Sequence, residues 1–227
     1  MKPITVLLAE DHTIVREGLH RLLEVESDIE VIAEAQTGRE AVQLAKKLSP
    51  AVVVMDIAMP VLNGLEALRQ ILKALPATRV LILSAHSDEA YIDQVMALGA
   101  AGYLIKQTSV QDLSKAIREV QKGNTFFSHS IFKRLNDHNR KSVMMNGKGQ
   151  IKKRSLSLSS REVEVIQLIA EGSANKQIAG ELNISIKTVE KHRQHLMEKL
   201  DIHDTAGLTR YAMAAGIIES SVQFTIR

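Results

Sequence analysis

Polar side chains follow several apolar runs in the first half of the sequence, at the point where each run ends. They are Glu10 and Asp11 after the first run, Asp56 after the third, Ser84 after the fourth and Lys106 after the fifth. Carboxylates that gather in one place repel one another unless a cation lies among them. Carboxylate oxygens suit octahedral Mg²⁺ better than a soft metal. The residue types therefore predict a magnesium site with a hydroxyl and an ammonium beside it.

Such a set of side chains suits the transfer of a phosphoryl group. The charges of Mg²⁺ and Lys106 would neutralise the phosphoryl oxygens, and this kind of catalysis depends mainly on positioning and electrostatics. Asp56 is then the natural nucleophile. A lone aspartate at a strand end usually caps a helix or lies in a solvated loop. Five such residues at four strand ends favour a functional site instead.

The elements that must position these residues follow from hydrophobic periodicity. Short apolar runs alternate with longer stretches of helical period through residue 125. Several runs are apolar throughout, as in strands that are buried on both faces of a parallel sheet. The pattern predicts an α/β fold, a doubly wound (βα)5 parallel sheet. Its strands are expected at residues 4–9, 30–34, 51–55, 79–83 and 102–105.

The second half of the chain has a different pattern. Residues 126–155 read as a linker with a possible short helix over 131–140, because the periodicity weakens and residues 148–154 are polar and basic. Residues 156–227 read as a small all-α domain with a helix-turn-helix. The expected helices are capped by Ser159 or Ser160, by Ser173 or Asn175, by Ser185 and by Asp204.

Composition and charge narrow the class of protein. Hydrophobic residues make up 45% and charged residues 24%, so the chain can fold around a core. Without a long apolar run or a cysteine, we expect a cytoplasmic protein with no membrane contact and no thiolate metal site. Residues 1–125 carry 13 Lys/Arg and 16 Asp/Glu, whereas residues 126–227 carry 16 and 10. The basic second half is therefore a candidate for binding a polyanion.

The first half contains a set of motifs: Glu10-Asp11, Asp56 with Met59-Pro60 and Gly64, Ser84-Ala85, and Gly102 to Lys106. With these motifs, residues 1–125 resemble the receiver domain of two-component response regulators. The resemblance implies that Asp56 accepts a phosphoryl group from a sensor histidine kinase. It also implies that Glu10, Asp11, Asp56 and the backbone carbonyl of Ala58 hold Mg²⁺, that Ser84 and Lys106 bind the phosphoryl oxygens, and that Tyr103 is a switch residue that turns inward.

An enzyme must be weighed against this interpretation. Phosphatases of the haloacid dehalogenase type also use an aspartate nucleophile, a Ser/Thr and a lysine around Mg²⁺, but an acid two places after the nucleophile protonates the leaving group. Here that place is Ala58, which cannot transfer a proton. We therefore predict that the protein is not an enzyme. A Mg²⁺-dependent aspartyl-phosphate phosphatase is a less favoured alternative.

The second half contains four motifs of a known kind: Leu158 to Val165, Ile178 to Ser185, Thr188 to His192, and Lys199-Leu200. With these motifs, residues 156–216 resemble the LuxR-type DNA-binding domain. In the longer helix of the predicted helix-turn-helix, four side chains face away from the apolar side and could reach base edges in the major groove: Lys187, Glu190, Lys191 and Gln194. The resemblance implies that five more lie toward the phosphate backbone: Asn175, Lys176, Thr188, His192 and Lys199. An apolar face of the last helix, with Leu208 and Ala212, could pair two subunits or complete the core of the domain.

These observations predict a response regulator similar to the NarL/FixJ group. Phosphorylation of Asp56 in a Mg²⁺-dependent reaction would alter the binding of double-stranded DNA and hence transcription. The expected partners are a sensor histidine kinase, DNA, the transcription machinery and a second copy of the chain, since we expect a homodimer in the active state. A receiver-controlled switch whose output domain binds protein or RNA is the main alternative.

Overall fold

The structure, a computed structural model, describes residues 2–85, 89–107, 109–127 and 158–218. The strands and helices up to residue 127 belong to one compact unit, and the helices from residue 160 onward belong to a second. The expected short helix over 131–140 and the basic stretch 148–154 lie outside the described residues. Among the helices that the structure describes, none is long and apolar enough to cross a membrane.

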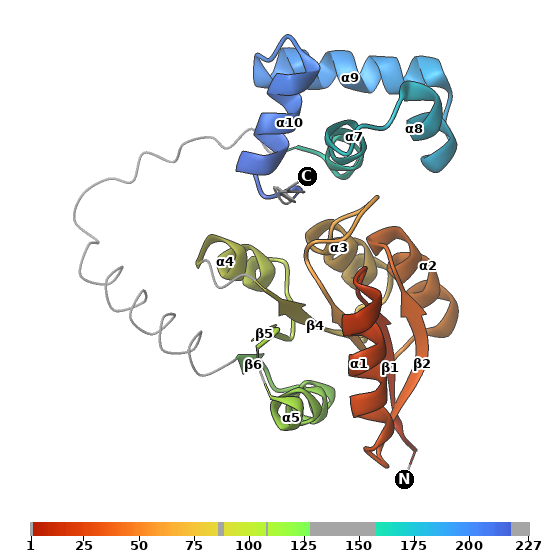
Figure 1. The fold of residues 1–227 in the computed structure, drawn as a ribbon, viewed down its shortest axis with the longest axis vertical. Coiled ribbons are helices and arrows are strands. Elements are labelled where there is room, and N and C mark those ends of the chain that lie inside the picture. The colour runs from red at the N-terminus through yellow and green to blue at the C-terminus, as the bar shows by residue number, and fades with distance from the viewer. Residues whose placement is uncertain (1, 86–88, 108, 128–157, 219–227) are drawn as a thin grey trace, which may run out of the picture. The chain divides into compact units, whose positions relative to one another are not determined.

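The first unit is built on a parallel sheet in the order β2-β1-β3-β4-β5-β6 (Figure 1). This confirms the predicted fold class, and the two-residue strand β6 extends the expected five strands. The strands are β1 (Ile4–Ala9), β2 (Ile29–Ala35), β3 (Val52–Met55), β4 (Arg79–Ser84), β5 (Gly102–Ile105) and β6 (Phe126–Phe127).

Strand β6 lies within the segment that the sequence analysis assigned to the linker, so the first two residues of that segment belong to the sheet. The backbone amide of Phe126 donates to the carbonyl of Ala101 at 3.0 Å. A side chain on Gly102 would prevent this pairing, because a Cβ there would lie 2.3 Å from the carbonyl oxygen of Phe126. A two-residue strand has no period of its own, so hydrophobic patterning could not detect it.

Five helices cover the sheet on both faces, and they are α1 (Thr13–Glu24), α2 (Gly38–Leu48), α3 (Gly64–Ala74), α4 (Glu89–Ala97) and α5 (Val110–Gln121). Helices α1 and α5 pack on one face, where Leu23 and Ile117 join Val6 and Val54 in a buried cluster. The other three helices contact the strands from the opposite face (Figure 1). The strand order reverses between β1 and β3, and ligands bind at such switch points, beyond the carboxyl ends of the strands.

The second unit consists of α7 (Ser160–Ala170), α8 (Asn175–Glu181), α9 (Ile186–Leu200) and α10 (Thr205–Ala214). The side chains of Ser159, Ser185 and Asp204 each accept a hydrogen bond from a backbone amide in the first turn, as predicted. The prediction for α8 was wrong, because neither Ser173 nor Asn175 is its N-cap. Ala174 occupies that place, and its amide donates to the Gln177 side chain at 2.7 Å.

Helix α10 completes the core of the second unit. Leu208 and Ala212 are fully buried, together with Val189 and Leu196 of α9. This burial favours the interpretation in which the apolar face of the last helix serves its own domain, since a face already covered by the core is not free to pair subunits.

Candidate functional site

The sheet brings the predicted residues together at one edge. Strands β1 and β3 are neighbours with Ala9 opposite Met55, so the residues that follow them leave the sheet side by side. The amide of Asp56 donates to the carbonyl of Ala9 at 2.9 Å. On the other side, the amide of Lys106 donates to the carbonyl of Ser84 at 2.8 Å. The candidate site therefore lies at the switch point of the sheet.

Lys106 reaches across the site to two carboxylates. Its Nζ atom lies 2.7 Å from Asp56 Oδ2 and 2.8 Å from Glu10 Oε2. Burial opposes the charge of this lysine, but the hydrogen bonds to Asp56 and Glu10 outweigh burial and raise its pKa. The ammonium is thus held in its charged form beside the proposed nucleophile.

Asp56 is buried, with 3% of its surface exposed. Its Oδ1 atom accepts a hydrogen bond from the Ile57 amide at 2.7 Å, while Oδ2 faces Lys106. Burial raises the pKa of Asp56 to about 6, with Glu10 adding to the rise and Lys106 opposing it. The carboxylate is therefore mostly ionised at pH 7 and able to act as a nucleophile.

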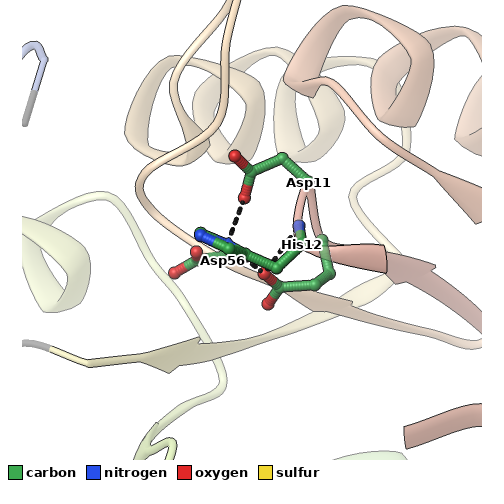
Figure 2. Close-up of side chains that lie close together, drawn as sticks. Asp11, His12 and Asp56 are labelled. Atoms are coloured by element: carbon green, nitrogen blue, oxygen red, sulfur yellow. Dashed lines mark hydrogen bonds and ion pairs between the residues drawn. The ribbon is translucent and has the colours of Figure 1, made fainter. Parts of the chain in front are cut away.

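The acidic side chains form a compact set of oxygen ligands. Glu10, Asp11, His12 and Asp56 each offer one ligand atom, and these atoms lie within 4.8 Å of one another. Figure 2 shows Asp11, His12 and Asp56 converging. The Oδ1 atom of Asp11 is buried and accepts no hydrogen bond from the residues that the structure describes, although His12 Nδ1 lies 2.9 Å away as its ionic partner. A buried carboxylate oxygen that lies close to the carboxylates of Glu10 and Asp56 fits a hard cation such as Mg²⁺.

Two residues near the site were missed by the sequence analysis. His12 lies beside both acids, and its pKa is raised, mainly by the charge of Asp11 and further by a hydrogen bond to Glu10. Arg16 is buried, and it donates to the backbone carbonyl of Glu10. The signal that the sequence contains is Arg16 itself, a charged residue near the start of the amphipathic helix α1.

The remaining predicted residues lie around this set. Ser84 and Tyr103 are fully buried on the neighbouring strands β4 and β5. Ala58 lies in the loop after β3. That loop passes close to Gly64, where a Cβ would lie 2.1 Å from the carbonyl oxygen of Asp56. The glycine therefore lets α3 begin directly against the backbone of the proposed nucleophile.

Helices α8 and α9 form the predicted helix-turn-helix. The turn between them contains Asn183 in the left-handed conformation, with φ 51°, which reverses the chain in a few residues. The side chain of Arg161 from α7 donates to the carbonyl of Leu182 at 2.9 Å and fixes this turn. The longer helix α9 buries Val189 and Leu196 on its inner side.

The opposite side of α9 presents the predicted base-reading residues. Lys187, Glu190, Lys191 and Gln194 are all exposed, at the spacing of one helix face, and Lys176 of α8 is exposed as well. The other predicted residues are Asn175, Thr188, His192 and Lys199, which are half-buried.

Two of these half-buried residues, Lys199 and His192, interact with other charged groups of their own domain. Lys199 forms an ion pair with Glu162 at 2.8 Å, so a contact with DNA phosphate would have to share its ammonium with that carboxylate. Burial lowers the pKa of His192, with the nearby charge of Arg161 acting in the same direction. Its surroundings therefore favour the neutral form of the imidazole.

Comparisons with known proteins agree with this geometry. Residues 6–118 match the response regulator receiver domain, and residues 156–212 match the bacterial regulatory proteins of the luxR family. The transcriptional regulatory protein LiaR of Bacillus subtilis is 38% identical over 209 residues, covering 92% of this chain and 96% of its own. The transcriptional regulatory protein MctR of Rhizobium johnstonii is 37% identical over 215 residues, covering 95% of each chain.

Solved structures point the same way. The response regulator RcsB in its complex with DNA is 28% identical, with a TM-score of 0.57, covering 94% of this chain and 99% of RcsB. A LuxR-family response regulator from Aurantimonas is 33% identical, with a TM-score of 0.59, covering 61% of this chain and 99% of its own. With its receiver domain and its LuxR-type DNA-binding domain, the chain belongs to the NarL/FixJ family of two-component response regulators, the DNA-binding regulators of transcription.

Proposed function

We propose that Asp56 is the phosphoacceptor through which a sensor histidine kinase controls this regulator. A carboxylate oxygen of Asp56 attacks the phosphorus of the kinase phosphohistidine, the P–N bond breaks, and its electron pair stays on the imidazole nitrogen. The product is an acyl phosphate on Asp56. The observation that carries the proposal is a buried, ionised aspartate whose carboxylate lies 2.7 Å from a lysine ammonium at the switch point.

The surrounding residues have separate roles in the transfer of the phosphoryl group. Glu10, Asp11, Asp56 and the carbonyl of Ala58 would hold Mg²⁺, which supplies positive charge against the phosphoryl oxygens when it is bound. Lys106 exchanges part of its contact with Asp56 for a phosphoryl oxygen and neutralises that oxygen as charge develops. The hydroxyl of Ser84 on the neighbouring strand donates to another phosphoryl oxygen.

Phosphorylation then acts as a population shift between two states of the receiver. When Ser84 turns toward the phosphoryl group, it changes the space in which Tyr103 packs, and the surface of the domain changes with it. A complete switch from 1% to 99% active requires about 5.5 kcal/mol of differential stabilisation. We propose that the active state is a homodimer that binds double-stranded DNA and acts on the transcription machinery in the cytoplasm.

Base recognition is assigned to the exposed side of α9. Lysine side chains pair with guanine, glutamine pairs with adenine, and each good pairing contributes about 1–3 kcal/mol of discrimination. Lys187, Lys191 and Gln194 are exposed on this side. Contacts with phosphate add affinity without sequence preference. For each neutralised phosphate, the slope of the logarithm of the binding constant against the logarithm of the salt concentration becomes more negative by about 0.9.

One experiment tests phosphoryl uptake and its coupling to DNA. The full chain is incubated with Mg²⁺ and acetyl phosphate, intact-mass spectrometry counts the phosphoryl groups, and bound duplexes are then selected from a random DNA pool. We expect one phosphoryl group in the natural protein and none in Asp56→Asn. A paired half-site motif should be enriched mainly in the phosphorylated sample. Phosphorylation that persists in Asp56→Asn would refute the assignment of the acceptor.

A second variant tests the reading surface. Replacing Lys187, Lys191 and Gln194 together with alanine should leave phosphoryl uptake unchanged and abolish the sequence preference in the DNA selection. Equal enrichment by the natural protein and this variant would place base recognition elsewhere. No enrichment of DNA by either protein would favour an output domain directed at protein or RNA.

A further inference from the structure

Arg16 is a charged residue in an unusual place. It is the fourth residue of α1, yet only 5% of its surface is exposed. A buried guanidinium is costly unless its donors and its charge find partners. Two of its nitrogen atoms do: Nε donates to Glu34 Oε2 at 2.9 Å, and Nη1 donates to the backbone carbonyl of Glu10 at 2.8 Å.

Glu34 anchors Arg16 from the neighbouring strand β2. Its second carboxylate oxygen, Oε1, makes a hydrogen bond with Nδ1 of His20 on α1. This bond to His20 lowers the pKa of Glu34, with burial opposing and Arg16 adding to the effect, so the carboxylate stays ionised. The two partners of the guanidinium therefore belong to the sheet: Glu34 lies on β2, and the carbonyl of Glu10 lies at the end of β1.

The contact of Arg16 completes a pair of backbone hydrogen bonds at Glu10, which we call the clamp on the acid pair, Glu10 and Asp11. The amide of Glu10 donates to the carbonyl of Ala35 at 3.0 Å, and its carbonyl accepts from Arg16. That carbonyl belongs to the peptide unit that joins Glu10 to Asp11, and this unit is planar. Rotation of the unit would move the carboxylate of Asp11, so the hydrogen bond from Arg16 limits where that carboxylate can lie.

Arginine is suited to this position, and lysine is not. The guanidinium presents donors in fixed, divergent directions within one plane, whereas an ammonium is a single nitrogen on a flexible stem. The two partners of Arg16 are contacted by two different nitrogen atoms of the guanidinium, and a single ammonium nitrogen lacks the fixed separation of donors that reaches both. The position therefore requires the shape of arginine as well as its charge.

We propose that Arg16, anchored by Glu34, is a positioning residue that holds the Glu10–Asp11 peptide in the orientation required for binding Mg²⁺. The inference rests on the proposed function, since it assumes that the acid pair binds Mg²⁺ for phosphoryl transfer. Residues that orient metal ligands in this way typically contribute 10–100-fold to metal affinity.

The test measures metal affinity directly, apart from phosphoryl transfer. Isothermal titration calorimetry of the full chain with MgCl₂ gives the dissociation constant for the natural protein and for Arg16→Lys and Arg16→Met. The matched control is Arg118→Met, which removes a second arginine ion pair of the same domain. Arg118 contacts Asp28 and Glu26, which precede β2 at the edge of the sheet opposite the acid pair.

We expect Arg16→Met to weaken Mg²⁺ binding by at least about 10-fold. Arg118→Met should keep the natural affinity, even if both variants lower the melting temperature. Arg16→Lys should fall near Arg16→Met, because it keeps the charge but cannot make both contacts. Phosphoryl uptake by the Arg16 variants should recover at saturating Mg²⁺, because the carboxylates themselves are intact.

Three results would overturn the inference. If Arg16→Met binds Mg²⁺ as tightly as the natural protein, the clamp does not orient the acid pair. If Arg118→Met weakens Mg²⁺ binding as much as Arg16→Met does, Arg16 contributes only to the general stability of the domain. Absence of Mg²⁺ binding in the natural protein would remove the proposed function together with the inference. If Arg16→Met does not fold, Glu34→Gln is measured in its place, because it weakens the ion pair that anchors Arg16 with little change in shape. An unchanged affinity for Mg²⁺ in Glu34→Gln would then also refute the inference.

Discussion

Replacing Asp56 with asparagine is predicted to stabilise the receiver domain in the absence of metal. The pKa of Asp56 is about 6 in the folded domain, mainly because of burial, against about 4 in an unfolded chain. The folded state therefore binds the proton more tightly. The stability contributed by this group is fully present below about pH 4 and is lost as the pH rises through about 6.

The size of this effect follows from the two pKa values. A difference of about two pH units corresponds to about 3 kcal/mol of stability lost at pH 7.5. Asparagine has nearly the same shape and stays neutral, so it removes this cost, while Lys106 loses one of its two carboxylate partners. We therefore expect Asp56→Asn to be more stable by about 1–3 kcal/mol at pH 7.5.

Differential scanning calorimetry of the full chain in EDTA measures this difference between pH 4 and pH 8. The receiver transition is identified as the one that Mg²⁺ shifts upward in the natural protein, since a ligand of the folded state stabilises it. The gain in Asp56→Asn should increase from pH 4 to about pH 6 and stay constant above that. A variant that is equally stable or less stable at pH 7.5 would refute the argument that burial of the charge sets the pKa.

Three further outcomes are expected. Gly64→Ala should slow phosphoryl uptake from acetyl phosphate by about 100-fold, because its Cβ would displace the backbone of Asp56. Gly18→Ala should not, because within the described residues its Cβ would have no neighbour within 4 Å beyond the adjacent residues and the backbone of its own helix. Arg118→Gln should lower the melting temperature at neutral pH but not at strongly acidic pH. Hydrogen bonds from Arg118 lower the pKa values of two carboxyl groups, so their stabilisation is lost as the pH falls through those lowered values. Ser159→Ala should cost the second unit about 1 kcal/mol of unfolding free energy, measured by urea titration, by removing the N-cap of α7.

Much of the site could be predicted because a parallel sheet has a simple geometry. The carboxyl ends of its strands share one edge, so residues that follow separate apolar runs, such as Glu10, Asp56 and Lys106, must meet. The exposed side of α9 could be predicted for a similar reason, since the helical period alone places Lys187 and Lys191 on one face. In both cases, a local repeat determines the direction in which each side chain points.

Other features depend on partners that are distant in the sequence. Arg16 contacts Glu34, 18 positions away, and Lys106 contacts Glu10, 96 positions away. Nothing in the sequence around Arg16 shows that its guanidinium is buried, and nothing around Asp56 shows the burial that raises its pKa. Hydrophobic patterning is enough to predict which chemical groups reach the edge of the sheet. Which of these groups are buried and paired follows from the fold, because desolvation and hydrogen-bond partners depend on the packing of the whole domain.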